Sequence, residues 1–364
     1  MHSRDLIKPD GRHLTLYSNR PIPDGIVATS PFAEPQHANP HLRWHALRGE
    51  WVAYAAFRQN RTYQPPPQYN PLAPTRDPEH PTEMPAGDYE IAVFDNRFPS
   101  LALDAHDPPT LTVPSAPANG QCEVVVFTQD PQAALGRLPL AHIELLLDVW
   151  ADRTRRFQGR HHIQYVLPFE NRGAEVGVTL HHPHGQIYAY PFVPPVPARQ
   201  LAQEREYYLQ HAASLLGDMA RAEAEDGKRV LYEDGHAIAF VPACARYPYE
   251  VWAMPTAPCR DFAALTPAQR SSLARALKTV LLKFDSLWER PFPYLMTWYQ
   301  APTDGADHPE TQLHCQFYPP YRTRDRLKYL AGTEIGAGMF AMDVLPETTA
   351  YELQQVDVRL EAAA

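Results

Sequence analysis

Short apolar runs bounded by proline and polar residues alternate with one long amphipathic stretch in the first half of the chain. Residues 91–98 and 123–128 form two such runs and predict buried strands. A helix is predicted next, because apolar residues recur there at helical spacing with charged residues on the other side; they are Leu140, Ile143, Leu147, Trp150 and Phe157. Two further strand-like runs, at 164–169 and 185–190, bracket a loop rich in histidine.

The second half repeats this order of elements. Strands are predicted at 237–241 and 250–254, followed by a helix with Thr266 as its N-cap and Pro267 in its first turn. After this helix the chain returns through strands at 294–298 and 313–318. A histidine follows each long helix at a similar distance, His184 in the first half and His314 in the second. The repetition favours an internal duplication, and two unrelated segments of similar appearance are the alternative.

We therefore expect an α+β fold of two related halves, residues 1–195 and 196–364, each an antiparallel sheet with packed helices. The first half would contain the reactive residues. A proline-containing linker at 191–197 and a polar helix around 204–225 are expected between the two sets of strands.

Composition narrows the class of protein. Apolar residues make up 44% of the 364, and no run approaches the roughly 18 apolar residues that mark a membrane span. Because no apolar leader follows Met1, we expect a cytoplasmic protein. The net charge of -9 argues against a nucleic-acid backbone as the main partner. The four cysteines are too far apart for a zinc knuckle or a disulfide scaffold.

The histidine-rich loop has the most informative chemistry. It contains the run His182-Pro183-His184-Gly185-Gln186, shortly after Phe-Glu-Asn-Arg-Gly at 169–173. On a strand, His182, His184 and Gln186 would face one surface, with Pro183 at the strand entrance. A neutral imidazole can attack phosphorus near pH 7 without a strong base, and an amide can donate to a phosphate oxygen. The second ring nitrogen then needs an acceptor, such as a backbone carbonyl in the Pro183 turn.

These two motifs together resemble the histidine-triad superfamily, and His-Pro-His-Gly-Gln resembles its galactose-1-phosphate uridylyltransferase branch. The resemblance implies that His184 attacks the α-phosphorus of UDP-glucose and passes the UMP to galactose 1-phosphate, a step of galactose metabolism. Ping-pong kinetics would follow from the covalent uridylyl-histidine. His182 and Gln186 would orient the nucleophile and the phosphate.

The resemblance also implies the substrate contacts, and it implies a homodimer whose two subunits share each active site. The phosphates would contact Arg58, Arg61, Asn171 and Thr179; the uracil and ribose would contact Asn96 and Phe98; and the hexose would contact Lys328, Thr333 and Glu334 of the C-terminal half. Guanidinium groups suit phosphate because they stay charged and bind it with two donors.

Many relatives hold a structural zinc through Cys-x-x-Cys, a distant histidine and the first histidine of His-Pro-His. Here the matching positions are Asn70, Ala73, Pro131 and His182, so one ligand of four is left. A second family metal site matches Gln200, Tyr299, His314 and Gln316, again with one ligand left. One ligand cannot hold a tetrahedral metal, so we expect no metal and no other cofactor.

Two alternatives stay open at this point. The same histidine also suits a related phosphorylase or adenylyltransferase that acts on ATP, a GDP-hexose or a dinucleoside polyphosphate. A nucleotide-binding or scaffold protein that has lost catalysis is the other alternative, although His184 and Gln186 argue against it. His181 is set aside, because strand alternation would direct it away from His184.

Overall fold

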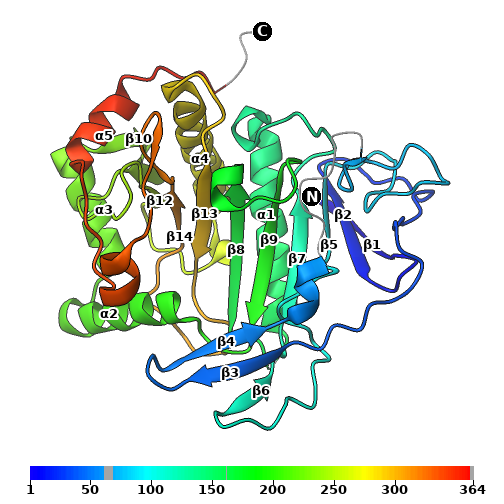
Figure 1. Cartoon of the computed structure of the whole chain (residues 1–364). Helices are drawn as coiled ribbons and strands as arrows, with labels where there is room; N and C mark the ends of the chain where they lie inside the picture. Colours follow the sequence, from blue (N-terminus) through cyan, green and yellow to red (C-terminus); the bar gives the residue numbers. More distant parts are fainter. Residues whose placement is uncertain (61–68, 161, 361–364) are drawn as a thin grey trace.

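One large antiparallel sheet organises the molecule (Figure 1). The computed structural model describes residues 1–60, 69–160 and 162–360. Within these residues the sheet has eleven strands, which in spatial order are β1 (His2–Ile7), β2 (His13–Ser18), β5 (Ile91–Asp95), β7 (Gln121–Val126), β9 (His184–Tyr190), β8 (Tyr165–Arg172), β13 (Tyr294–Tyr299), β14 (His314–Tyr318), β12 (Val251–Pro255), β11 (Ala237–Phe240) and β10 (Val230–Glu233).

The strand order contains the same unit twice. In the first half, β5, β7, β8 and β9 pair in the order β5-β7-β9-β8; in the second half, β11, β12, β13 and β14 pair in the order β11-β12-β14-β13. A long helix lies between the second and third strands of each unit, α1 (Leu140–Gln158) in the first and α4 (Pro267–Leu287) in the second. The units meet edge to edge, where β8 pairs with β13. The predicted α+β class with two related halves is confirmed, and their sheets form one continuous sheet.

The two long helices lie next to each other on one face of the sheet and build the main core with it. Trp150 of α1 packs against Phe262 and against Trp298 of β13, at ring-centroid distances of 5.4 and 5.5 Å. This core therefore contains side chains of both halves. The predicted start of α4 is also confirmed, because Thr266 and Gln269 form a complete capping box.

The prediction of a single polar helix around 204–225 is wrong. The chain forms two helices there, α2 (Pro195–His211) and α3 (Leu215–Asp226). Ala212, with a positive φ of 52°, ends the first, and the Ser214 side chain caps the second. The expected linker also stops earlier, because Pro195 and Pro197 belong to the first turn of α2, where proline is tolerated.

A small sheet lies across the lower part of the other face (Figure 1). It consists of β3 (His41–His45), β4 (Glu50–Tyr54) and β6 (Ser115–Pro117), none of which was predicted from the sequence. Its Leu42 belongs to the cluster against which Tyr188 and Tyr190 of β9 pack. The small sheet therefore covers the C-terminal part of β9, away from His184 at its first residue.

The remaining elements are short. They are α5 (Pro346–Gln354), the hairpin β15 (Tyr321–Thr323) and β16 (Arg326–Leu327), and the single turns η1 (Ala56–Asn60), η3 (Leu135–Arg137), η4 (Ala174–Val176), η5 (Phe262–Ala264) and η6 (Thr333–Ala337). No helix in the described part of the chain has the length and apolar character needed to cross a membrane.

The shared aromatic core predicts a large cost for Trp150→Ala. The side chain is 1% exposed, and its removal leaves a cavity between the two halves. We expect the free energy of unfolding to fall by about 3–5 kcal/mol in urea denaturation. Trp44→Ala, at a half-buried position of the small sheet, should cost clearly less. Equal losses in the two variants would contradict a core shared between the halves.

Candidate active site

His184 is the first residue of β9, directly after Pro183. Its Nδ1 lies 2.7 Å from the backbone carbonyl oxygen of His182. Since a carbonyl can only accept, Nδ1 has the proton and Nε2 keeps its lone pair. This carbonyl is the acceptor expected in the Pro183 turn. Among the described residues, Nε2 has no hydrogen-bond partner.

The surroundings of His184 favour its neutral form. The residue is half-buried, and burial lowers the pKa of its imidazole because the charged ring would lose hydration. The bond to the His182 carbonyl opposes this effect but does not outweigh it. At neutral pH the ring is therefore an uncharged base with one available lone pair.

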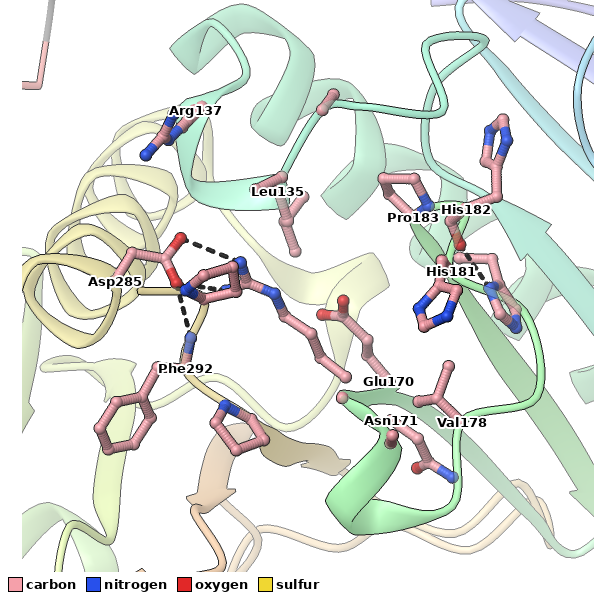
Figure 2. Close-up of a pocket in the computed structure, with 18 of the residues that line it drawn as sticks. Leu135, Arg137, Glu170, Asn171, Val178, His181, His182, Pro183, Asp285 and Phe292 are labelled. Carbon is pink, nitrogen blue, oxygen red and sulfur yellow. Dashed lines mark hydrogen bonds and ion pairs between the residues drawn. The ribbon is translucent and has the colours of Figure 1, made fainter. Parts of the chain in front are cut away.

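A cavity of about 900 Å³ adjoins this histidine. It opens between η3, the segment from Glu170 to His184, and the end of α4, and Figure 2 shows Glu170 and His181 within it. Asn171 also lines it, and Arg172 forms a two-pronged ion pair with Asp285 at 2.7 and 3.0 Å. The volume is within the usual range for small-molecule sites, and the lining is rich in hydrogen-bonding groups.

Four of the predicted residues lie in one hydrogen-bonded group. Gln186 shares the half-buried face of β9 with His184, and its Oε1 accepts from Asn96 Nδ2 at 3.3 Å. Asn96 Oδ1 accepts from the backbone N–H of Phe98, whose carbonyl accepts from Arg58 at 2.5 Å. Because its oxygen is taken, Gln186 has its amide N–H groups left for another acceptor. They have no partner within the residues that the structure describes.

The other predicted contacts lie in two further segments of the chain. Thr179 is in the loop between Val178 and Leu180, which both line the cavity. Lys328, Thr333 and Glu334 belong to a separate segment, where Lys328 Nζ lies 3.6 Å from a Glu334 carboxylate oxygen. None of these three lines the cavity. Arg61 lies outside the described residues.

Two sequence-based expectations about side-chain direction are wrong. His182 does not share the open face of His184 and Gln186; it precedes β9 and is 2% exposed. His181 does not point away, because it lines the same cavity as His184. Both errors have one cause: β9 begins at His184, so the strict alternation of a strand does not extend to residues 181 and 182.

Family models match almost the whole chain. The model of the galactose-1-phosphate uridyl transferase N-terminal domain matches residues 30–194, and that of the C-terminal domain matches residues 200–363. The chain belongs to the galactose-1-phosphate uridyl transferase family. The family indicated by the His-Pro-His-Gly-Gln run is thereby confirmed.

Individual members of the galactose-1-phosphate uridyl transferase family are similar in sequence to this chain over nearly their full length. The galactose-1-phosphate uridylyltransferase of Thermotoga maritima is 36% identical, over 88% of this chain and 99% of that protein. The enzyme of the same name from Streptomyces lividans is 33% identical, over 95% of this chain and 96% of that protein. A solved structure described as a uridylyltransferase superposes with a TM-score of 0.76 at 31% identity, over 86% of this chain and 97% of that one.

The residues at the first family metal position do not fit zinc. Ala73 and Pro131 have no side-chain donor atoms, and the Asn70 amide nitrogen is directed at His182. His182 itself is bonded at both ring nitrogens, to Asn70 at 3.0 Å and to the Thr128 carbonyl at 2.7 Å. A tetrahedral zinc needs four free electron pairs, which this set does not offer.

The second family metal position is likewise filled by hydrogen bonds. His314 is 3% exposed; its Nδ1 donates to the Gln312 carbonyl at 2.8 Å, and its Nε2 accepts from Gln316 at 3.0 Å. The Gln316 oxygen accepts from the Tyr318 hydroxyl, which lies 3.0 Å from that of Tyr299. Both ring nitrogens of His314 are therefore engaged, and the part of the chain that the structure describes contains no cluster of His, Cys, Asp and Glu that could hold a metal here.

Glu170 lines the cavity, and the sequence alone assigned it no role. Glu170 is 3% exposed, and burial raises the pKa of its carboxyl group to about 7. The Tyr294 hydroxyl donates to it at 2.9 Å across the junction of the two halves. The Phe-Glu-Asn-Arg-Gly run contained this signal, but the partner on β13 is 124 positions away.

The raised pKa of Glu170 predicts a pH-dependent stability difference. The folded protein keeps a proton that the unfolded chain releases near pH 4.5, so stability falls as pH rises from there through about 7. We expect wild type to lose about 3 kcal/mol of unfolding free energy relative to Glu170→Gln between pH 4 and pH 8. The exposed variant Glu289→Gln is the control, and its unfolding free energy should change with pH in the same way as that of wild type. If the unfolding free energies of Glu170→Gln and wild type changed with pH in the same way, the raised pKa of Glu170 would be disproved.

Proposed function

We propose that this protein transfers UMP from UDP-glucose to galactose 1-phosphate, which gives UDP-galactose and glucose 1-phosphate. Family membership and the names of the curated relatives support the reaction. The geometric observation that carries it is His184: a neutral imidazole with Nδ1 bound to a carbonyl, Nε2 available, and a cavity alongside.

In the first half-reaction, His184 Nε2 attacks the α-phosphorus of UDP-glucose. The Nε2–P bond forms while the bond from that phosphorus to the bridging oxygen breaks, and glucose 1-phosphate leaves with the electron pair. The ring becomes cationic, and the His182 carbonyl stabilises it by accepting the Nδ1 proton in a hydrogen bond. No proton needs to move, so the step requires no separate base.

In the second half-reaction, a phosphate oxygen of galactose 1-phosphate attacks the same phosphorus. The Nε2–P bond breaks, the electron pair returns to the imidazole, and UDP-galactose is released. The acceptor is already an anion, so again no base is needed. Since donor and acceptor use the same phosphorus in turn, the kinetics are ping-pong.

The other residues have positioning and charge-stabilising tasks. The free amide donors of Gln186 bind a non-bridging oxygen of the transferred phosphate. Asn171 and Thr179 hold the phosphates, and Arg58 and Arg61 neutralise their charge. Asn96 and Phe98 lie next to Gln186 and contact the uridine.

We further propose a homodimer in which one subunit completes the site of the other. Among the described residues, Lys328 and Thr333 neither line the cavity nor join the hydrogen-bonded group of Gln186, and their side-chain hydrogen bonds stay within their own segment. Their segment exposes large apolar side chains, with Tyr329 at 76% and both Ile335 and Met339 at 66%. Apolar groups gathered in this way are typical of an interface between subunits. The segment then meets the hexose bound in the partner's site.

Replacement of the nucleophile tests the covalent step. His184→Gly should take up no uridylyl label from UDP-glucose that is radiolabelled in the uridine, and it should show no turnover, because no other group holds the phosphorus. His80→Gly, at an exposed histidine of a surface turn, should label as wild type does. Turnover of the His184→Gly variant near the wild-type rate would refute the assignment.

Co-expression of two inactive variants tests the shared site. His184→Gly lacks the nucleophile, and Lys328→Ala/Thr333→Ala lacks hexose contacts but keeps Glu334, which binds the backbone of its own segment. Each mixed dimer would contain one intact site, so random pairing should restore about a quarter of wild-type activity. Activity no higher than that of the separate variants would show that each site is formed within one chain.

A further inference from the structure

The side chain of Asn70 contacts the histidine next to the nucleophile. Its Oδ1 accepts from the backbone N–H of Leu72 at 3.0 Å, and its Nδ2 lies 3.0 Å from His182 Nδ1. A backbone N–H can only donate, so the bond to Leu72 fixes which end of the amide holds the oxygen. The amide N–H groups are therefore directed at the ring of His182.

The other side of that ring is fixed by an equally unambiguous partner. His182 Nε2 lies 2.7 Å from the Thr128 carbonyl oxygen, which can only accept, so Nε2 has the proton and Nδ1 has the lone pair. This tautomer is the one that the Asn70 amide requires. The ring is 2% exposed and held from both sides by matched donors and acceptors.

The backbone of the same histidine orients the nucleophile. The His182 carbonyl accepts from His184 Nδ1 at 2.7 Å, and only Pro183, with its restricted φ, separates the two residues. Asn70 is therefore connected to His184 through the ring and the backbone carbonyl of a single residue, His182. Movement of the His182 ring would displace the acceptor that fixes the tautomer and direction of His184.

We propose that Asn70 is a positioning residue for uridylyl transfer, holding His182 and thereby the nucleophile without a metal. The inference rests on the proposed function. A metal ion at His182 Nδ1 would need the lone pair that the Asn70 amide already binds, so the two are mutually exclusive. Residue 70 stands where many relatives have a zinc-binding cysteine, and here an amide replaces the metal bond with a hydrogen bond.

Single-turnover kinetics of Asn70→Ala test the positioning role. We expect uridylylation, followed as release of glucose 1-phosphate, to slow about 10- to 100-fold, because a misplaced nucleophile loses rate. The dissociation constant of UMP, a ligand that cannot react, should stay within about 2-fold, since Asn70 does not line the cavity. A wild-type rate, or a loss of UMP affinity as large as the loss of rate, would overturn the proposal.

Asn39→Ala is the matched control. This exposed asparagine also bonds a backbone carbonyl and a backbone N–H, both of His106, but outside the site. It should uridylylate at the wild-type rate. If wild type itself takes up no uridylyl group, the proposed function fails; if wild type labels and Asn70→Ala labels equally fast, only the role of Asn70 fails.

Two measurements on the wild-type protein do not depend on any variant folding. Nitrogen-15 NMR of the histidine rings should show His182 as the single tautomer protonated at Nε2; protonation at Nδ1 would overturn the proposal. Metal analysis should find far less than one zinc per chain, with full activity after dialysis against a chelator. Stoichiometric zinc whose removal abolishes activity would also overturn it.

Discussion

The hydrogen bond from His184 Nδ1 to the His182 carbonyl is the interaction on which the site depends. It decides which ring nitrogen holds the proton, and so which one keeps the lone pair that is proposed to attack phosphorus. The second half shows the same geometry, because His314 Nδ1 donates to the carbonyl two residues earlier. The two histidines differ in access: His314 is 3% exposed with Nε2 bonded to Gln316, whereas His184 is half-buried beside a cavity.

The duplicated sheet shows how the proposed nucleophile and a structural histidine can occupy equivalent positions of the two halves. Each unit provides a strand that begins with a histidine followed two residues later by a glutamine, His184 and Gln186 in one and His314 and Gln316 in the other. In the second unit, the amide nitrogen of Gln316 donates to Nε2 of His314. In the first unit, the amide oxygen of Gln186 instead accepts from Asn96. The partner of the glutamine thus determines whether the histidine Nε2 is available for chemistry.

Elements with strong local signals could be predicted from the sequence, whereas long-range contacts could not. The start of α4 follows from Thr266, Pro267 and Gln269, which lie within one turn. The junction of the halves through β8 and β13, and the small sheet, depend on pairings between distant segments. Similarly, the histidine motif points to His184 as the candidate nucleophile, but the hydrogen bond that holds the His182 ring comes from Asn70, which is 112 positions away. Only the folded chain brings these groups together.

A crystal structure of the protein soaked with UDP-glucose tests the central claim most directly. The account predicts a uridylyl group bonded through phosphorus to Nε2 of His184, with Nδ1 still donating to the His182 carbonyl. A phosphorus atom bonded to Nδ1 or to any other residue, or an intact UDP-glucose bound away from this ring under conditions of turnover, would contradict it.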